Sequence, residues 1–503
     1  MQEFKETDSK VVFEGNFKNG KKNGYGKVYW RQNYGQNSKR SELDSPNKFP
    51  NSVNERAIFS LEQKPLLRYE GDFENGMRHN QGKQYNSDGI IEYDGDFCQD
   101  LREGTGKFYT IINEDQKEDQ SLGKSGQGTT KYTIFLRYFG EWKVDFYHGE
   151  GKQFNEDESV EYEGEFQKGK RSGNGVYYHE NGLVMYDGPW VNGEQSGKGK
   201  YFDENGNLRY FGDWEDGKTH GLGTYYYEDG ITVMYYGGRK LGQRHGLGKY
   251  YHSNGTLIYN GNWIDNKREG YGIQFRENGS KYYEGYWLKD QITGNGKKFY
   301  NNNEIAYKGD FFEGKFHGKG KLFSKEAVLE YEGGYDMGNR SGVGKEYFKN
   351  GIISYDGNWN NNVKEGEGTD YYENGGVSYR GNFNNGLRQG SGTSYYDNKQ
   401  ICYVGDWLAG TKHGKGSWYN RDGELKFQGN WHKDTYQDGK NIYFTNGNLK
   451  MKGDWNGINL PGKGVEYYEN GKVMWTGEIL GRSRHGYGKY YDENGIQQSS
   501  GIW

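Results

Sequence analysis

Seven of the ten histidines in this 503-residue chain share one position of a repeated segment. Imidazole is the commonest metal ligand among side chains, so this pattern could indicate a metal site. The seven are His79, His148, His220, His245, His317, His413 and His485. A zinc site needs ligands that converge, usually with cysteines or carboxylates at short spacing. Only His220 and His245 fall in consecutive copies, so we expect turn-edge residues and no metal site.

Lys or Arg precedes that position in eleven copies, which predicts a row of positive charge along one edge of the stacked copies. This basic row consists of Lys22, Arg78, Arg102, Arg171, Arg244, Arg268, Arg340, Lys364, Arg388, Lys412 and Arg484. One interpretation is a docking surface for acidic partners, such as tubulin tails or phosphoinositide head groups. The other is a solvated turn whose charge is offset by Glu103, Glu269 and Glu365.

No arrangement typical of catalysis rises above the repeated pattern. Gly-x-Gly recurs in nearly every copy, but no helix start that could cradle a phosphate follows it. We therefore expect no nucleotide or other cofactor. No Ser/His/Asp or Cys/His set stands out either, so we expect that the chain is not an enzyme.

Composition restricts the partners and the compartment. With 66 basic and 70 acidic residues the net charge is -4, too balanced for nucleic-acid binding. Cys98 and Cys402 lie far apart and cannot form a disulfide framework, which indicates a reducing compartment. Residues 1–12 do not resemble a secretory signal, and no apolar run approaches the roughly 20 residues that span a bilayer. We expect a cytoplasmic or cytoskeletal protein, neither secreted nor transmembrane.

The repeated segment begins Tyr-x-Gly-x-Trp or Phe and recurs about eighteen times, with a period of 24 residues over most of the chain. In the reference copy, Tyr259–Tyr282, the position of Gly261 is Gly in all eighteen copies, and that of Phe275 is Tyr or Phe. Such self-similarity is typical of arrays in which each unit packs on its neighbours. We expect one array over residues 13–503, preceded by a lead-in of residues 1–12.

Each copy is predicted to form two strands. Tyr259, Gly261 and Trp263 alternate with polar residues, which is the period of a strand with one ring-bearing face. A short turn follows, and Asn278-Gly279, a typical hairpin dipeptide, ends the second strand. We therefore expect an all-β fold, an elongated and twisted single-layer antiparallel meander of hairpins.

The strand glycines need a physical reason, because glycine weakens a strand. A missing Cβ lets a neighbouring ring lie flat on the backbone, so rings and glycines are expected to stack in rows that replace an aliphatic core. Gly272 and Phe275 have opposite parity along the strand. Either a bulge intervenes between them or Phe275 faces the other side of the sheet.

The stretch Tyr210–Gly223 reads Tyr-Phe-Gly-Asp-Trp-Glu-Asp-Gly-Lys-Thr-His-Gly-Leu-Gly and resembles the MORN repeat almost position for position. Similar proteins serve in ciliary radial-spoke heads and axonemes, as cortical scaffolds in protists, and as accessory modules of phosphoinositide kinases, junctional membrane proteins and methyltransferases. Because repeats fill the chain, no kinase or methyltransferase domain is expected.

The resemblance implies a non-enzymatic scaffold for protein–protein assembly in a cytoskeletal complex, foremost a ciliary axoneme and within it a radial-spoke head. Its partners would be other proteins of that assembly. The alternative is a membrane-surface adaptor that binds anionic phospholipids through the basic row.

Two insertions interrupt the period, at about residues 31–67 and 112–131. Departures from a repeat often carry individual function, although a loop of no function is equally compatible with the sequence.

The last residues begin a further copy, with Gly501, Ile502 and Trp503 at repeat positions. An unpaired strand edge recruits further strands. We expect this edge to be covered by β-augmentation from a partner or by self-association with a second copy.

Overall fold

The computed structural model describes residues 4–8, 11–30, 66–113, 132–444, 447–455, 461–480 and 483–503. These residues form 39 strands and no helix, which confirms the predicted all-β fold. In this part of the chain there is accordingly no helix long and apolar enough to cross a membrane. Most of the two predicted insertions, 31–67 and 112–131, and part of the predicted lead-in, 1–12, lie outside the described residues.

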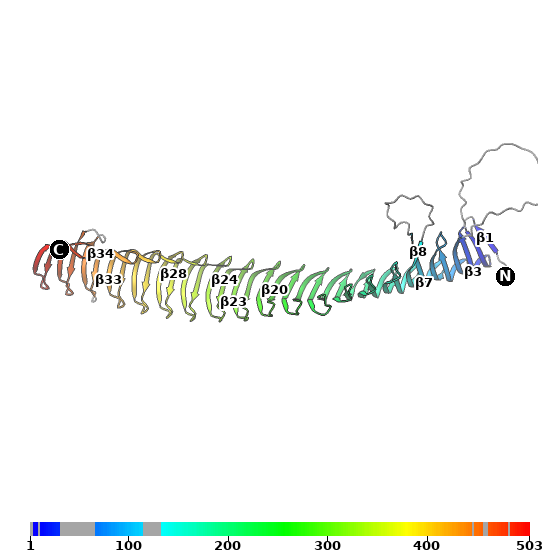
Figure 1. The fold of residues 1–503 in the computed structure, drawn as a ribbon, viewed down its shortest axis with the longest axis horizontal. Coiled ribbons are helices and arrows are strands. Elements are labelled where there is room, and N and C mark those ends of the chain that lie inside the picture. Colours follow the sequence, from blue (N-terminus) through cyan, green and yellow to red (C-terminus); the bar gives the residue numbers. More distant parts are fainter. Residues whose placement is uncertain are drawn as a thin grey trace, which may run out of the picture. The chain divides into compact units, whose positions relative to one another are not determined.

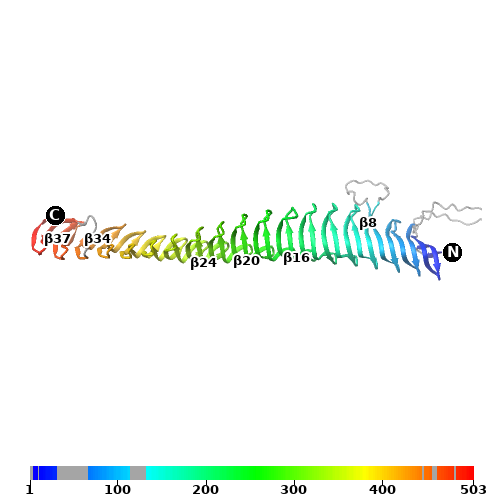
Figure 2. The same ribbon diagram turned by 90° about the horizontal axis from the view of Figure 1, so that it is seen from below.

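The chain divides into an N-terminal half, Met1–Arg244, and a C-terminal half, His245–Trp503. In each half, consecutive strands lie side by side, and apart from β3–β4 and β7–β8 the described connections are short turns (Figures 1 and 2). The strands up to residue 240 are β1 (Phe4–Asp8), β2 (Val11–Lys18), β3 (Lys21–Trp30), β4 (Leu67–Glu74), β5 (Met77–Tyr85), β6 (Ile91–Cys98), β7 (Leu101–Asn113), β8 (Tyr132–Lys143), β9 (Phe146–Phe154), β10 (Val160–Gln167), β11 (Lys170–Tyr178), β12 (Val184–Val191), β13 (Glu194–Gln195), β14 (Gly197–Phe202), β15 (Leu208–Glu215), β16 (Lys218–Tyr226) and β17 (Val233–Lys240).

The remaining strands are β18 (Gln243–Tyr251), β19 (Leu257–Ile264), β20 (Lys267–Phe275), β21 (Lys281–Leu288), β22 (Gln291–Phe299), β23 (Ile305–Phe312), β24 (Lys315–Phe323), β25 (Leu329–Asp336), β26 (Asn339–Tyr347), β27 (Ile353–Asn360), β28 (Val363–Tyr371), β29 (Val377–Asn384), β30 (Leu387–Tyr395), β31 (Ile401–Leu408), β32 (Thr411–Tyr419), β33 (Leu425–His432), β34 (Thr435–Tyr443), β35 (Leu449–Trp455), β36 (Pro461–Tyr467), β37 (Val473–Leu480), β38 (Ser483–Tyr491) and β39 (Gln497–Ile502).

The reference copy, Tyr259–Tyr282, shows why these residues form hairpins. Its two strands are antiparallel, with Gly261 opposite Gly272, and the turn between them places Asp265 and Asn266 at positive φ. Gly272 in turn lies opposite Gly285 of the next repeat. The glycines therefore form one line that crosses successive strands, as the predicted stacking requires.

Rings lie on this glycine line. The Tyr259 side chain is 1% exposed, and a Cβ built on Gly272 would lie 2.6 Å from its Cε2. The ring meets Trp263 of its own repeat at 5.1 Å and Trp287 of the next at 5.6 Å, both edge to face. Edge-to-face contacts are the favoured geometry of aromatic pairs. We call this alternating row of rings the aromatic ladder, and the side of the sheet that carries it the ladder face.

Gly270 has a different role from Gly272. Its φ is +66°, and the pairing of the strands shifts between Gly261 and Trp263, opposite this glycine. Left-handed backbone within a bulge favours glycine or asparagine. Asn80, which replaces this glycine in one repeat, has φ of 51°. Ring packing was the reason predicted for all the strand glycines. For Gly270 that reason is wrong.

The open question about Phe275 is answered: a bulge intervenes, and the ring also faces the other side. Pairing shifts between Gln274 and Phe275. At the equivalent position, the hydroxyl of Tyr85 donates a hydrogen bond of 2.9 Å to Glu70. Glu70 lies between Tyr69 and Gly71 and thus points away from the ladder face. These rings are therefore not part of the aromatic ladder.

The face opposite the ladder carries ion pairs between consecutive repeats. Lys321 pairs with Glu332 at 2.9 Å, and Lys345 with Asp356 at 3.4 Å. Lys152 pairs in the same way with Glu163 in the N-terminal half.

Repeats are also joined through the turns equivalent to that at Asn278-Gly279. Asn302 Oδ1 accepts a hydrogen bond from the Glu304 amide, and its Nδ2 donates at 3.1 Å to the Lys325 carbonyl of the next repeat. Asn350 bonds to the Glu373 carbonyl in the same way. Asparagine at this position therefore shapes the turn and also links neighbouring turns.

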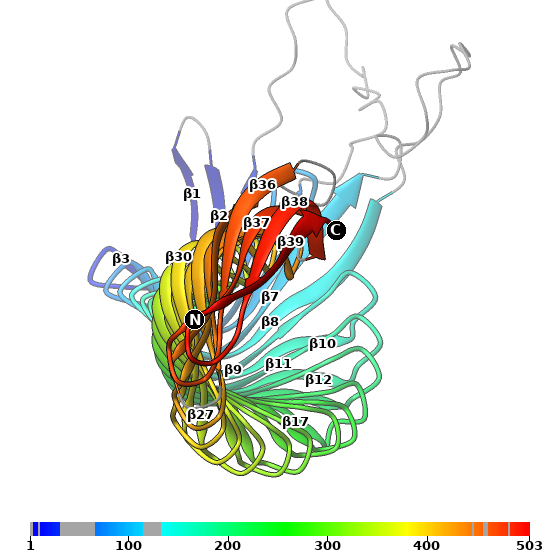
Figure 3. The same ribbon diagram turned by 90° about the vertical axis from the view of Figure 1, so that its left-hand side faces the viewer.

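Two segments depart from the expected boundaries. Residues of the predicted lead-in form β1, which pairs with β2 from Phe4 opposite Gly15 to Asp8 opposite Val11. The strands β7 and β8 (Figure 3) have 13 and 12 residues, and their pairing continues to Asn113 opposite Tyr132. The hairpin thus extends into the predicted second insertion at its first two residues.

Candidate interaction surfaces

The shared histidines lie beside the turns and do not converge. His220 Nδ1 lies 2.9 Å from Glu215, and His317 Nδ1 lies 3.5 Å from Asp336, each an acid of a nearby turn. Among the described residues no three His, Cys, Asp or Glu side chains are close enough to hold a metal ion. Glu269, at the same repeat position, accepts a hydrogen bond from the Lys289 amide of the next turn. At His317 and Glu269 the position connects one turn to the next, whereas His220 contacts an acid of its own hairpin.

The basic row lies over the aromatic ladder. The Arg268 guanidinium is 4.0 Å from the ring centre of Trp287 and 5.8 Å from that of Tyr259. Every member of the row stands over at least one ring in this way: Lys22, Arg78, Arg102, Arg171, Arg244, Arg268, Arg340, Lys364, Arg388, Lys412 and Arg484. Cations over ring faces are attracted by the ring quadrupole, so the row covers and stabilises the ladder.

At least eight of these eleven cations also form an ion pair. Arg268 pairs with Asp290 of the next turn at 2.9 Å, and Arg340 with Glu346 of its own repeat at 2.6 Å. The side chain of Arg268 is 24% exposed. These contacts engage much of the charge within the sheet, and the role of the row in docking an anion stays a prediction.

Sequence reasoning missed a row of exposed apolar side chains at the turns of the C-terminal half. Seven consecutive repeats each place one such residue in the two-residue turn between their strands or directly beside that turn. We call this the apolar turn row: Ile264, Leu288, Phe312, Met337, Val363, Leu387 and Leu408, which are 38–52% exposed. Since neighbouring strands are antiparallel, these turns lie along one edge of the sheet.

Charge is low along part of this edge. The turns at residues 360–363, 384–387 and 408–411 contain no ionisable side chain. An apolar side chain in a turn of otherwise polar residues was the signal in the sequence that could have identified the row.

The predicted C-terminal contact residues lie in and after β39. Gly501 pairs with Gly488, Ile502 is 88% exposed, and Trp503 is 45% exposed. The Arg484 guanidinium stands 5.2 Å from the Trp503 ring centre.

The family model described as "MORN repeat" matches fifteen segments of the chain. These are residues 13–33, 69–90, 138–155, 162–184, 186–208, 210–232, 235–257, 259–281, 283–304, 307–325, 331–353, 355–377, 379–400, 403–424 and 484–497. Together they cover more than half of the chain.

Among curated proteins there is no match. Among solved structures, the chain is similar to the crystal structure of TcdB2-TccC3, with 9% identity and a TM-score of 0.14, over 88% of this chain and 23% of that one. It is also similar to the Tc holotoxin pore of Photorhabdus luminescens, with 9% identity and a TM-score of 0.11, over 99% of this chain and 28% of that one. The chain thus spans about a quarter of the length of these structures, and likeness at such TM-scores carries no argument. The repeat match, in contrast, covers more than half of the chain, and the chain therefore belongs to the MORN repeat family.

Proposed function

We propose that the chain is a non-enzymatic scaffold that holds other proteins in a cytoskeletal assembly. The narrower proposal is a ciliary axoneme, and within it a radial-spoke head. The narrower part rests on the resemblance to MORN proteins of such assemblies. The broader part rests on the apolar turn row of the C-terminal half.

The spacing of this row suits a long helix of a partner. Each repeat adds two strands of roughly 4.8 Å each, so Ile264, Leu288 and Phe312, which end β19, β21 and β23, recur about every 10 Å. In a helix, residues seven apart lie on nearly the same face, separated by about 10.5 Å. A helix with one apolar residue in each heptad can therefore contact consecutive turns, in the manner of other helix-in-groove complexes.

The alternative function is a membrane-surface adaptor that binds anionic phospholipid through the basic row. An electrostatic membrane contact requires cations that are available to lipid head groups. Most cations of the row already stand over rings and pair with acids such as Asp290, Glu346 and Asp370. These contacts favour the scaffold over the adaptor.

The test uses cells that naturally contain the chain and a tagged full-length variant in which Ile264, Leu288 and Phe312 are all changed to Asn. Two repeats already have Asn at the equivalent position, Asn360 and Asn384, so the fold should tolerate the change. We expect the wild type to remain with the detergent-insoluble cytoskeletal fraction and the variant to fall at least tenfold there.

The matched control changes two exposed apolar residues that lie outside the turns of the same half, Leu247→Asn with Val343→Asn. They are 71% and 69% exposed, and Asn174 and Asn295 occupy the equivalent position in other repeats. This control should remain in the cytoskeletal fraction.

A wild-type protein that detergent extracts completely would contradict the scaffold. If it also floats with phosphoinositide vesicles, and charge reversal of Arg244, Arg268 and Arg340 abolishes that binding, the adaptor is correct. Retention in a cytoskeletal structure outside cilia would leave the scaffold intact and refute the axonemal part.

A further inference from the structure

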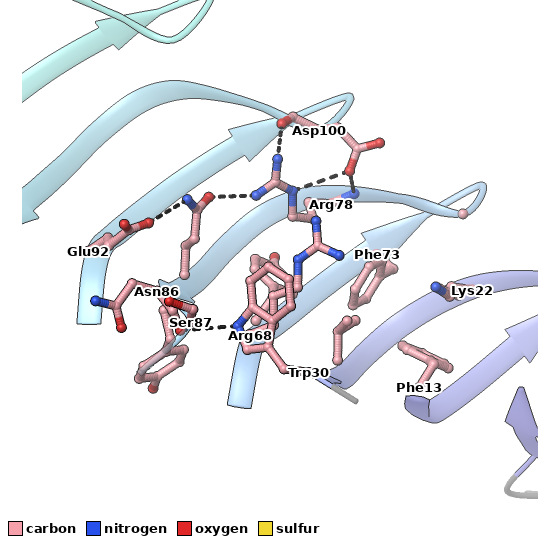
Figure 4. A pocket seen from close by; sticks show the side chains of 15 residues that line it. Phe13, Lys22, Trp30, Arg68, Phe73, Arg78, Asn86, Ser87, Glu92 and Asp100 are labelled. Carbon is pink, nitrogen blue, oxygen red and sulfur yellow. Dashed lines mark hydrogen bonds and ion pairs between the residues drawn. The ribbon is translucent and has the colours of Figure 1, made fainter. Parts of the chain in front are cut away.

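A groove of about 870 Å³ opens on the ladder face of the N-terminal half, over β3, β4 and β5. Its lining includes the cations Lys22, Arg68 and Arg78, the ring of Trp30, and the acids Glu92 and Asp100 (Figure 4). The volume lies within the usual range of ligand sites, roughly 300–1,000 Å³. The groove therefore brings three cations and only two acids to one hollow.

Both acids of the groove belong to one hydrogen-bonded network with Arg78, Asp100 directly and Glu92 through Gln84. The Arg78 guanidinium lies 3.3 Å from the Asp100 carboxylate and donates to Gln84 at 2.7 Å. Gln84 in turn donates to Glu92 at 3.0 Å. Figure 4 shows this network on one side of the groove, away from Lys22.

Lys22 lacks the acids that serve other members of the basic row. Arg268 takes its acid from the next turn, at Asp290, and Lys364 takes its acid from its own second strand, at Asp370. The residues at those two positions around Lys22 are Gly76 and Val28. Its ammonium stands 4.9 Å from the ring centre of Phe13, and within residues 11–30 and 66–113 it forms no ion pair.

Arg68 is the second cation of the groove without an acid. Its guanidinium stacks 4.6 Å from the ring centre of Trp30, and Trp30 is held by a 3.1 Å hydrogen bond from Nε1 to the Asn86 carbonyl. In the same described part of the chain, Arg68 also forms no ion pair. In Figure 4 the side chain of Phe73 lies between Arg68 and Lys22.

We propose that this groove binds an extended acidic peptide segment of a partner protein. Its carboxylates would pair with Lys22 and Arg68, and an apolar side chain between them would pack beside Trp30. A guanidinium accepts a carboxylate through two parallel hydrogen bonds, and partial desolvation against rings strengthens such pairs. Two cations on either side of a phenyl ring fit two successive carboxylates of a peptide better than they fit one small anion.

The experiment uses the full chain and a fluorescent synthetic peptide of alternating Glu and Phe, and measures binding by anisotropy. The test variant combines Lys22→Gln with Arg68→Gln. The matched control is Lys364→Gln, which removes a cation that stands over a ladder ring and already has its acid. We expect the double variant to bind at least tenfold more weakly than the wild type, and the control to bind within twofold.

Hydrogen exchange checks folding and location. The peptide should slow exchange in β3, β4 and β5 of the wild type, and without peptide the double variant should exchange like the wild type. Absence of wild-type binding, or equal binding by the double variant, overturns the proposal. Inorganic phosphate or phosphatidylinositol-4,5-bisphosphate vesicles that displace the peptide at equal or lower concentration would assign the groove to a phosphate ligand and also overturn it.

The outcome is separable from that of the proposed scaffold. The variant of Ile264, Leu288 and Phe312 should bind the acidic peptide normally, since those residues lie in the C-terminal half. If the groove does not bind the peptide, the proposed role of the apolar turn row is unaffected, and the reverse also holds.

Discussion

The change Gly272→Ala tests whether a ring lying on the backbone is the reason for the strand glycines. Gly272 has no positive φ, so alanine brings no backbone strain of that kind. A Cβ there would lie 2.6 Å from Cε2 of Tyr259 and closer still to Cζ and Oη. Tyr259 cannot move freely, because its ring contacts both Trp263 and Trp287. The added methyl group must therefore displace a buried ring.

The expected cost has three parts. Overpacking a buried site costs about 1–3 kcal/mol. Displacing the ring also breaks the 3.2 Å hydrogen bond from the Tyr259 hydroxyl to the Asn262 carbonyl, which contributes about 0.5–1.5 kcal/mol. Alanine recovers about 0.5–1 kcal/mol of backbone entropy relative to glycine. The net loss of local stability is then about 2 kcal/mol.

Hydrogen exchange of the full chain measures this loss locally, which suits an array whose repeats need not unfold together. A loss of about 2 kcal/mol should speed amide exchange in β19, β20 and β21 by roughly 30-fold. A parallel Asn262→Val variant, which adds bulk away from the ladder face, should change exchange little.

A second background isolates the ring. In the repeat that begins with Met451, the three atoms nearest to a Cβ built on Gly464 all belong to Ile479. Gly272→Ala should therefore cost much less in a Tyr259→Met protein than in the wild type. Equal acceleration of exchange in both backgrounds, or none in either, would refute the ring-on-glycine explanation.

Three further changes test other contacts of the sheet. Asn302→Ala removes the link to the Lys325 carbonyl and should destabilise the adjoining turns by about 1 kcal/mol, seen as faster amide exchange there but not at the opposite edge. Arg268→Met should cost about 1 kcal/mol through the lost contact with Trp287, and urea unfolding that matches the wild type would show that the basic row does not stabilise the ladder. Burial raises the pKa of Tyr235, Tyr331 and Tyr379 to about 12. Because these folded-state pKa values exceed the unfolded value near 10, their stabilisation is complete below pH 10 and is lost as the pH rises towards 12. Thermal stability should fall in that window together with a late rise in tyrosinate absorbance, after the exposed tyrosines have ionised near pH 10. Ionisation of every tyrosine near pH 10 without loss of structure would contradict the burial of the ladder.

One repeat shows how far the glycine requirement extends. Lys440 stands where every other repeat has the glycine equivalent to Gly272. The pairing of β33 with β34 shifts there, and Gly439 lies opposite Gly429 instead. When the repeats are aligned by sequence, the glycine is lost at this position. The shifted strand register nevertheless places a glycine, Gly439, opposite Gly429.

The candidate surfaces were predictable to different degrees. The basic row followed from its spacing, because equivalent residues of stacked repeats must lie in a row. The position of the row over the rings could not be predicted, because the bulge that sets Arg268 opposite Trp263 has no unambiguous signal in the sequence. The isolation of Lys22 became visible only once the acids that pair with other members of the row, such as Asp290 and Asp370, were known. The apolar turn row was present in the sequence, but each residue looks ordinary until its neighbours are aligned.

The sequence by itself determined the all-β fold, the hairpin repeat and the places of its turns. These depend on local chemistry: side chains alternate along a strand, and Asn-Gly and similar dipeptides adopt the positive φ that tight turns need. The tertiary structure alone decided which glycine accommodates a ring and which bends the backbone, which face Phe275 occupies, and which acids neutralise which cations. Those outcomes depend on register between strands, and register is set by bulges and by contacts with the next repeat, such as Arg268 with Asp290, 22 residues away.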